Sequence, residues 1–261
     1  MKQELIKPVV RVGNSAGIIL PKEWLNGKAR VELVEKPLNI KREVLEILYS
    51  YLHDVKGVYL VGSYAREEQT SRSDVDVLVI TSKIRKKIEV GKYYFILIPE
   101  EELKNELNKN ALPFVPMLKE AKTIINEKLI ENYVNISPTK KNLKNRIELS
   151  KSALSIDKEM IELDREWPSK CSDAVAYSLI LNLRTIYIVD KLRKNREISN
   201  KELKQLIKKI SGSLNAYEGY LRVKNNEKEK EALPVEEADK LHRYAIEKLE
   251  EVENWLKERK D

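Results

Sequence analysis

The 261-residue sequence predicts an α+β protein built from a small β domain, a mixed α/β layer and a C-terminal antiparallel four-helix bundle. Short apolar runs between Gly and Asn turns open the chain, and β-type and helical segments alternate in its middle. From about residue 139 onward only helical periodicity is found. We therefore expect domains at residues 1–37, 38–136 and 137–261.

Composition points to a globular chain with an anionic partner. Charged residues make up 35% and hydrophobic residues 42% of the sequence, and the formal net charge is +7. A positive balance favours a nucleotide, tRNA or DNA as partner, although charge alone specifies none of them. The single cysteine, Cys171, excludes an internal disulfide, and two histidines are too few for a zinc site without carboxylates.

The N-terminal sequence MKQELIKPVV lacks the apolar run of a secretory signal. No stretch approaches the roughly twenty apolar residues that span a membrane. We therefore expect a cytoplasmic protein with no membrane partner.

Residues 4–36 are expected to form three short strands, LIKPVVRV, GIILP and ARVELVE. Gly13-Asn14-Ser15 and Asn26-Gly27 supply turns between them, and Pro21 ends the second strand. A unit this small buries too little apolar surface to be stable alone. We therefore expect it to interlock with a second copy, giving a homodimer through residues 1–37.

The stretch VVRVGNSAGIILPKEWLNGKARVELVE closely resembles the swapped-hairpin AbrB/MazE (SpoVT-AbrB-like) family of DNA-binding domains. The resemblance implies a dimer of paired β-hairpins whose basic surface contacts DNA. Alternatively, this part only dimerises the protein and its charges form a solvated face, because basic residues give phosphate affinity without reading any base. The DNA-binding candidates are Arg11, Asn14, Ser15, Lys22, Lys28 and Arg30.

After Pro37 the sequence predicts a mixed layer of helices and strands. Apolar residues at helical spacing indicate a helix over 40–54. Strands are expected at 57–62, 74–81 and 92–98, with a short helix after the first strand. A helix near 99–109 and amphipathic segments over 117–134 complete the layer.

The run LVGSYAREEQTSRSDVDVLVIT, from Leu60 to Thr81, contains the most informative motif. Alternate residues of a strand point to the same face, so Asp74 and Asp76 project together as ligands for a hard cation such as Mg²⁺. Gly62 lets the backbone present N–H groups to a triphosphate, and Ser63 adds a hydroxyl. A solvated strand face is the alternative, but the apolar residues around the two acids indicate a strand buried on both sides.

The pattern Gly-Ser, ten residues, Asp-x-Asp resembles the DNA polymerase β-like nucleotidyltransferase superfamily, and most closely its minimal nucleotidyltransferase branch. The resemblance covers about residues 38–136 and implies transfer of NMP from an NTP, with ATP expected. It implies that Gly62 and Ser63 hold the nucleotide and that Asp74 and Asp76 hold Mg²⁺. Arg66 and Arg72 are further candidate phosphate contacts, or else exposed loop charges.

A third carboxylate of that family, on the following strand, is missing from its expected place. The strand reads YYFILI, with Ile96 near the expected acidic position. Glu89 would enter the site as a catalytic carboxylate if residues 87–90 form a hairpin with 93–98. Otherwise the site is weakened or inactive as an enzyme.

The C-terminal part is predicted to contain four antiparallel helices. Trp167-Pro168 closes the first helix, and the second runs over 172–194. Ser199 and Glu202 form a capping box before the third helix, which Gly212 ends. A polar loop at 224–232 leads to the last helix.

This helical order resembles a HEPN-type domain, a frequent companion of minimal nucleotidyltransferases. HEPN ribonucleases carry Arg, four residues and then His, but neither His53 nor His242 has an Arg five positions earlier, so ribonuclease activity is not expected. Arg184 lies in the corresponding helix, and Val189 stands at the position of the histidine. We interpret Arg184 as a cation that packs against neighbouring residues or faces a nucleotide, or else as a surface charge. The aromatic residues at helical spacing are interpreted as core rather than base-stacking residues, namely Tyr187, Tyr217, Tyr220 and Trp255.

Three functions from different classes follow. The first is a Mg²⁺-dependent nucleotidyltransferase acting on a hydroxyl of a protein, a tRNA or a small molecule. The second is an AbrB-type DNA-binding regulator whose degenerate nucleotidyltransferase domain senses nucleotide. The third is a structural dimer in a toxin-antitoxin-like assembly.

Overall fold

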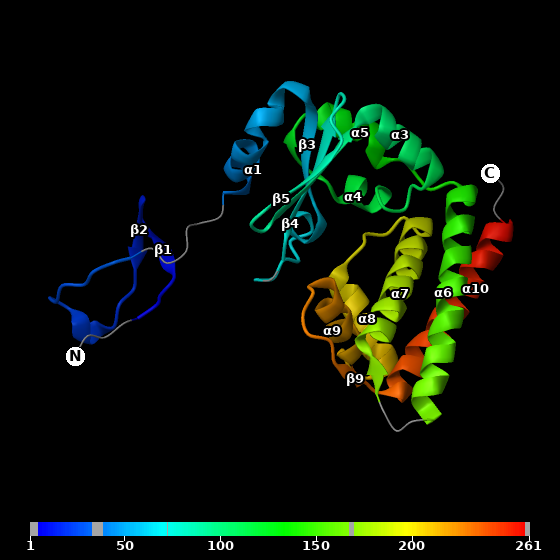
Figure 1. Cartoon of the computed structure of the whole chain (residues 1–261). Coiled ribbons are helices and arrows are strands. Elements are labelled where there is room, and N and C mark those ends of the chain that lie inside the picture. The colour runs from blue at the N-terminus through cyan, green and yellow to red at the C-terminus, as the bar shows by residue number, and fades with distance from the viewer. Residues whose placement is uncertain (1–4, 33–38, 72, 167–169, 259–261) are drawn as a thin grey trace. The chain divides into compact units, whose positions relative to one another are not determined.

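The computed structural model describes residues 5–32, 39–71, 73–166 and 170–258 (Figure 1). The chain divides into two compact units between Glu43 and Val44. The domain boundary predicted at residue 37 lies outside the described residues.

The first unit contains an antiparallel hairpin of β1 (Val9–Val12) and β2 (Ser15–Ile18), followed by the short 3₁₀ helix η1 (Lys22–Trp24). Gly13, at the turn, has φ +58°, a left-handed conformation that glycine adopts at little cost. The third predicted strand, ARVELVE, is not seen in its described part, residues 29–32. A strand requires a hydrogen-bonding neighbour, and none of the described residues of this unit pairs with that segment.

This first unit has no core of its own in its described part. None of residues 5–32 is buried. Ile6 and Ile19 are 75% and 72% exposed. Further exposed apolar side chains in the same segment are Leu5, Val9, Val12, Leu20, Leu25 and Val31. The hairpin is therefore formed by backbone pairing without the apolar burial that would stabilise it alone.

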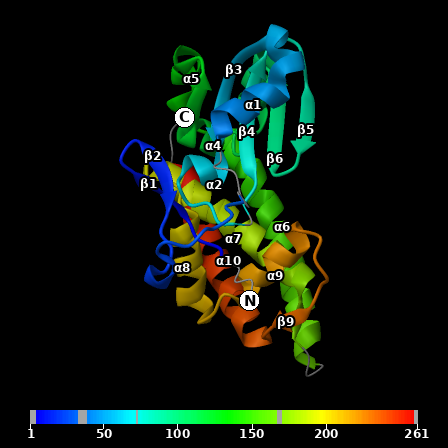
Figure 2. The same cartoon turned by 90° about the vertical axis from the view of Figure 1, so that its left-hand side faces the viewer.

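The second unit begins with a five-stranded sheet of order β5-β6-β4-β3-β7. Strands β4 and β6 are parallel, whereas the pairs β5–β6, β3–β4 and β3–β7 are antiparallel. Figures 1 and 2 show the sheet with helices on both sides. The strands are β3 (Val55–Val61), β4 (Val75–Thr81), β5 (Lys86–Val90), β6 (Tyr93–Pro99) and β7 (Lys122–Ile125).

The predicted strands are confirmed within two residues at each end, and the conditional hairpin of β5 with β6 forms. Strand β7 was not predicted, because its four residues lie between two short helices and merge with their amphipathic pattern. The surrounding helices are α1 (Ile40–Leu48), η2 (Tyr49–Asp54), α2 (Gly62–Ala65), α3 (Glu100–Lys109), α4 (Val115–Glu120) and α5 (Glu127–Val134).

Apolar residues of β3, β4 and β6 fill both faces of the sheet. On one face Tyr59, Leu78 and Ile98 pack in a core with residues of α3, α4 and α5. The alternate residues, among them Val58 and Val79, are also fully buried. Figure 2 shows α1 lying across the sheet. Burial on both faces explains why β3 and β4 read as nearly continuous apolar runs.

The remainder of the unit is helical, with a second core made by α6, α7, α8, α9 and α10. Short strands β8 and β9 pair beside them, so the expectation of no strand after residue 139 is wrong in this detail. No helix in the described ranges is long and apolar enough to cross a membrane. The bounds are α6 (Lys140–Glu166), β8 (Cys171–Ser172), α7 (Asp173–Arg193), α8 (Asn200–Ser211), α9 (Asn215–Lys224), β9 (Glu231–Leu233) and α10 (Val235–Glu258).

Helix α9 is a fifth helix in this region and was not predicted as one. Gly219 lies inside it, and glycine is a poor helix former in isolation. A Cβ atom at Gly219 would lie 2.8 Å from the Cβ of Ala176 and 2.8 Å from Oδ1 of Asp173. The glycine is therefore explained by the close approach of α9 to α7, a tertiary contact that local sequence does not reveal.

We expect Leu154→Ala to lower the free energy of unfolding by about 2–5 kcal/mol, because Leu154 is fully buried in the helical core and its loss leaves a cavity. The matched control is Leu149→Ala on the same helix, where the side chain is 63% exposed. Urea unfolding followed by circular dichroism measures both. Equal losses for the two variants would contradict the packing described here.

Candidate nucleotide site

The turn from β3 into α2 brings Gly62 against the first residues of β4. Val61 pairs with Asp76 across the two strands. Gly62 has φ +71°, and a Cβ atom there would lie 2.3 Å from Oδ2 of Asp76. A larger residue would force the Asp76 side chain to move, so the left-handed backbone conformation and the close approach both favour glycine.

Asp74 and Asp76 stand at the start of β4, as the motif predicts. Asp74 immediately precedes the strand and is exposed, whereas Asp76 is half-buried. Burial raises the pKa of Asp76, and Asp74 and Glu120 act in the same direction, while Lys224 and Arg66 oppose it. A half-buried carboxylate with two negative neighbours is a donor set that suits a divalent cation.

The register of the sheet separates Glu89 from the two aspartates. Asp76 pairs with Tyr94 of β6, and Tyr94 pairs with Glu89 of β5. The three residues therefore share one face, with Tyr94 between the acids and two strand spacings, about 10 Å, between the outer backbones. Tyr94, rather than Ile96, is level with Asp76. Within the described ranges no group of three or more His, Cys, Asp or Glu side chains could hold a metal ion.

The other predicted nucleotide contacts lie around α2. Ser63 is half-buried in the first turn, and its carbonyl accepts a hydrogen bond from the Glu68 amide at 2.9 Å. Arg66 forms ion pairs with Glu68, at 3.0 Å, and with Glu120. Burial disfavours the charged guanidinium, but these two carboxylates outweigh it and raise the pKa of Arg66. Arg72 lies outside the described residues.

Glu68 connects the motif to the helical core. Its carboxylate accepts hydrogen bonds from the hydroxyl of Ser199, the amide of Asn200 at 2.9 Å and the amide of Lys201 at 3.3 Å, all at the start of α8. Burial opposes ionisation of Glu68, but these donors and Arg66 hold its pKa at about 2. Sequence reasoning missed this contact because its partners are more than 130 residues away.

Side chains of α7 and α9 also lie near the motif. The rings of Tyr177 and Tyr220 stack with centroids 5.4 Å apart, and Arg184 donates to the Tyr220 hydroxyl at 3.5 Å. Burial raises the pKa of Tyr217, and the charges acting on it include Glu68 and Arg66 of the motif. The aromatic residues are thus packed, as expected, yet close enough to the motif to feel its charges.

The six DNA-binding candidates in the first unit are all exposed. Arg11 is positioned by its own turn, because its Nε donates to the carbonyl of Gly13 at 2.9 Å. The other candidates are Asn14, Ser15, Lys22, Lys28 and Arg30. Their exposure agrees with the prediction without testing DNA binding.

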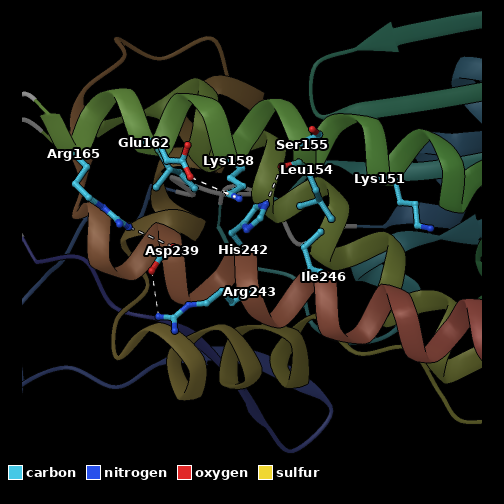
Figure 3. A pocket seen from close by; sticks show the side chains of 11 residues that line it. Lys151, Leu154, Ser155, Lys158, Glu162, Arg165, Asp239, His242, Arg243 and Ile246 are labelled. Atoms are coloured by element: carbon cyan, nitrogen blue, oxygen red, sulfur yellow. Dashed lines mark hydrogen bonds and ion pairs between the residues drawn. The ribbon is translucent and has the colours of Figure 1, made fainter.

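A cavity of about 530 Å³ lies between α6 and α10, away from the motif residues (Figure 3). Its basic side chains have carboxylate partners: Lys158 with Glu162, and both Arg165 and Arg243 with Asp239. Its histidine, His242, is bonded to the Leu154 carbonyl at 2.8 Å. The cavity therefore presents compensated charges, and none of the motif residues lines it.

Glu68 gives a pH prediction for stability. Its pKa is lower in the folded chain than its usual value of 4.5, so its stabilising contribution is complete above pH about 4.5 and disappears as the pH falls toward 2. Glu68→Gln should therefore unfold more easily than the unsubstituted chain at pH 7, by about 1–2 kcal/mol, with the difference vanishing near pH 2.

Denaturant unfolding at several pH values measures this, and Glu131→Gln, an exposed carboxylate on α5, is the control. A pH-independent difference for Glu68→Gln would contradict the role of the ionised carboxylate.

Part of the chain matches a known protein family. Residues 42–142 match the family described as polymerase beta, nucleotidyltransferase. No protein of curated function matches the chain. The family match does not extend to the AbrB-like and HEPN-like resemblances, which stay predictions.

Two solved structures are similar at low identity. A nucleotidyltransferase-like protein from Exiguobacterium sibiricum 255-15 is 14% identical, with TM-score 0.37, and the match covers 82% of this chain and 75% of that one. The spectinomycin adenyltransferase AAD(9) from Enterococcus faecialis, solved with ATP and spectinomycin, is 16% identical, with TM-score 0.44, over 80% and 97% of the two chains. The family match confirms the prediction made from the motif: residues 42–142 form a nucleotidyltransferase domain of the polymerase β type.

Proposed function

We propose that the protein is a Mg²⁺-dependent nucleotidyltransferase that transfers NMP from an NTP, with ATP expected, to a hydroxyl group of a protein, a tRNA or a small molecule. The observation that carries the proposal is the close approach of Gly62 to Asp76 within the matched domain. In this arrangement the turn at Gly62, whose amide is the proposed phosphate donor, lies beside Asp74 and Asp76, carboxylates of the type that binds Mg²⁺.

Each group would have a distinct task. Asp74 and Asp76 would hold Mg²⁺, which when bound neutralises charge on the triphosphate. The Gly62 amide, the Ser63 hydroxyl and Arg66 would orient the phosphates, with Arg72 as a further predicted contact. The acceptor oxygen forms a bond to the α-phosphorus. The bond between that phosphorus and the oxygen that bridges the α- and β-phosphates breaks, and pyrophosphate leaves.

The acceptor hydroxyl must lose a proton in this reaction. Glu89 is the predicted carboxylate for that role, and it lies on the same face of the sheet as Asp76 but two strands away. Direct transfer to Glu89 would require the acceptor to lie over Tyr94. Substitution of Glu89 therefore tests the proposed proton acceptor separately from the two aspartates.

A second proposal concerns residues 1–37. The exposed apolar side chains of residues 5–32 support a homodimer formed through this segment. Its exposed basic residues support binding to DNA phosphates, so a DNA-binding regulator that senses nucleotide is the alternative function.

We expect Asp74→Ala and Asp76→Ala each to reduce Mg²⁺-dependent NTP turnover by about 10²-fold or more, because each removes a metal ligand without removing core packing. Release of pyrophosphate and labelling of a cell extract with α-labelled NTP measure this. Glu131→Ala should retain full activity. Undiminished labelling by the double aspartate variant would refute the site.

Glu89→Gln in the same assay should lose on the order of 10²-fold or more if Glu89 is the third metal ligand or the catalytic base. An unchanged rate would remove Glu89 from the mechanism and leave the two aspartates as the catalytic carboxylates.

Deletion of residues 1–37 should convert a dimer into a monomer and abolish DNA affinity, while nucleotide binding at the motif persists. Light scattering measures the mass, and binding of the full chain to duplex DNA should weaken steeply with salt because the contacts would be to phosphates. A truncated chain that stays dimeric would contradict the interlocking of this segment.

A further inference from the structure

Glu120, the last residue of α4, occupies two of the donors assigned to the nucleotide. Its Oε1 accepts the amide hydrogen of Gly62 at 2.7 Å, and its Oε2 accepts from the Nη1 of Arg66. Its side chain is only 12% exposed, as is that of Arg66. A carboxylate of the chain thus meets one backbone amide and one guanidinium, the pair of groups by which proteins commonly hold a phosphate oxygen.

The position of Glu120 is not explained by its own helix. The C-terminal end of a helix carries partial negative charge, which disfavours a carboxylate there. Asp76 is a second carboxylate close by, because the charge of Glu120 raises the pKa of Asp76. Glu120 therefore stands in negative surroundings, and its contacts with Gly62 and Arg66 are what stabilise it.

We propose that Glu120 is an internal competitor for the triphosphate: its carboxylate occupies the phosphate subsite formed by the Gly62 amide and Arg66, and it must leave this subsite when an NTP binds. The proposal rests on the proposed function of the same site. It makes Glu120 a determinant of affinity and anion selectivity, since an incoming anion must outcompete a carboxylate already in place.

The neighbouring contacts allow the exchange without dismantling the site. Arg66 is also paired with Glu68, and Glu68 is fixed to the start of α8 by three hydrogen bonds. When Glu120 leaves, Arg66 therefore keeps a partner that holds it in place. A triphosphate bound with Mg²⁺ offers several oxygens to the freed donors, whereas a simple monoanion offers little more than Glu120 itself.

The decisive experiment compares the affinity of the full-length chain and its variants for ATP with Mg²⁺ and for inorganic tripolyphosphate, by isothermal titration calorimetry. Glu120→Gln keeps the shape of the side chain and an acceptor for the Gly62 amide, but removes the charge. We expect it to bind both ligands about tenfold more tightly, the worth of one charge-assisted contact. Glu120→Asp keeps the charge on a shorter side chain and should show a smaller gain. Glu131→Gln should bind like the unsubstituted chain.

The outcomes separate the two proposals. If the unsubstituted chain binds ATP and Glu120→Gln binds it equally or more weakly, with thermal unfolding unchanged, Glu120 only positions the loop and the competitor role is refuted. If Glu120→Gln binds ATP and the unsubstituted chain does not, the competitor role is supported in its strongest form. If none of the chains binds either ligand, the proposed function fails and the competitor role fails with it. Should Glu120→Gln unfold, Glu120→Asp decides by the same comparison.

Discussion

The candidate site depends on one steric constraint, the contact between the Gly62 backbone and the Asp76 carboxylate. A single Cβ atom at residue 62 would lie 2.3 Å from Oδ2 of Asp76. β3 and β4 pair directly, with Val61 opposite Asp76. The turn after β3 therefore lies beside the first residues of β4, whatever the conformation of the loop that connects the two strands. The sheet therefore sets the distance between the turn at Gly62 and the carboxylates of β4, and the side chains only refine it.

Around this contact, negative groups are balanced by a few cations from distant parts of the chain. The ionised form of Asp76 is disfavoured by Asp74 and Glu120 and is favoured by Lys224 and Arg66. Lys224 belongs to α9, so the helical core takes part in the electrostatics of the sheet. A site with more carboxylates than cations nearby is suited to a divalent cation such as Mg²⁺.

Much of the fold and part of the site could be predicted from the sequence. The Gly62, Asp74 and Asp76 motif was recognised because its residues are close in sequence and its strands are strongly apolar. Glu120 and Glu68 were missed because each acts through a tertiary contact, with Gly62 in one case and with α8 in the other. Strand β7 and helix α9 were missed for a similar reason: β7 is defined by pairing with β3, and α9 by close packing on α7.

The attachment of Glu68 to the start of α8 also has a consequence for biosynthesis. The chain is synthesised from its N-terminus, so the motif leaves the ribosome long before Ser199 and Asn200 have been made. The sheet strands β3 to β7 can pair as they appear, but the hydrogen bonds that fix Glu68, and through it Arg66, wait until α8 has been synthesised. The candidate nucleotide site therefore reaches its final geometry only after α6 and α7 have been synthesised, although the sheet that carries it emerges earlier.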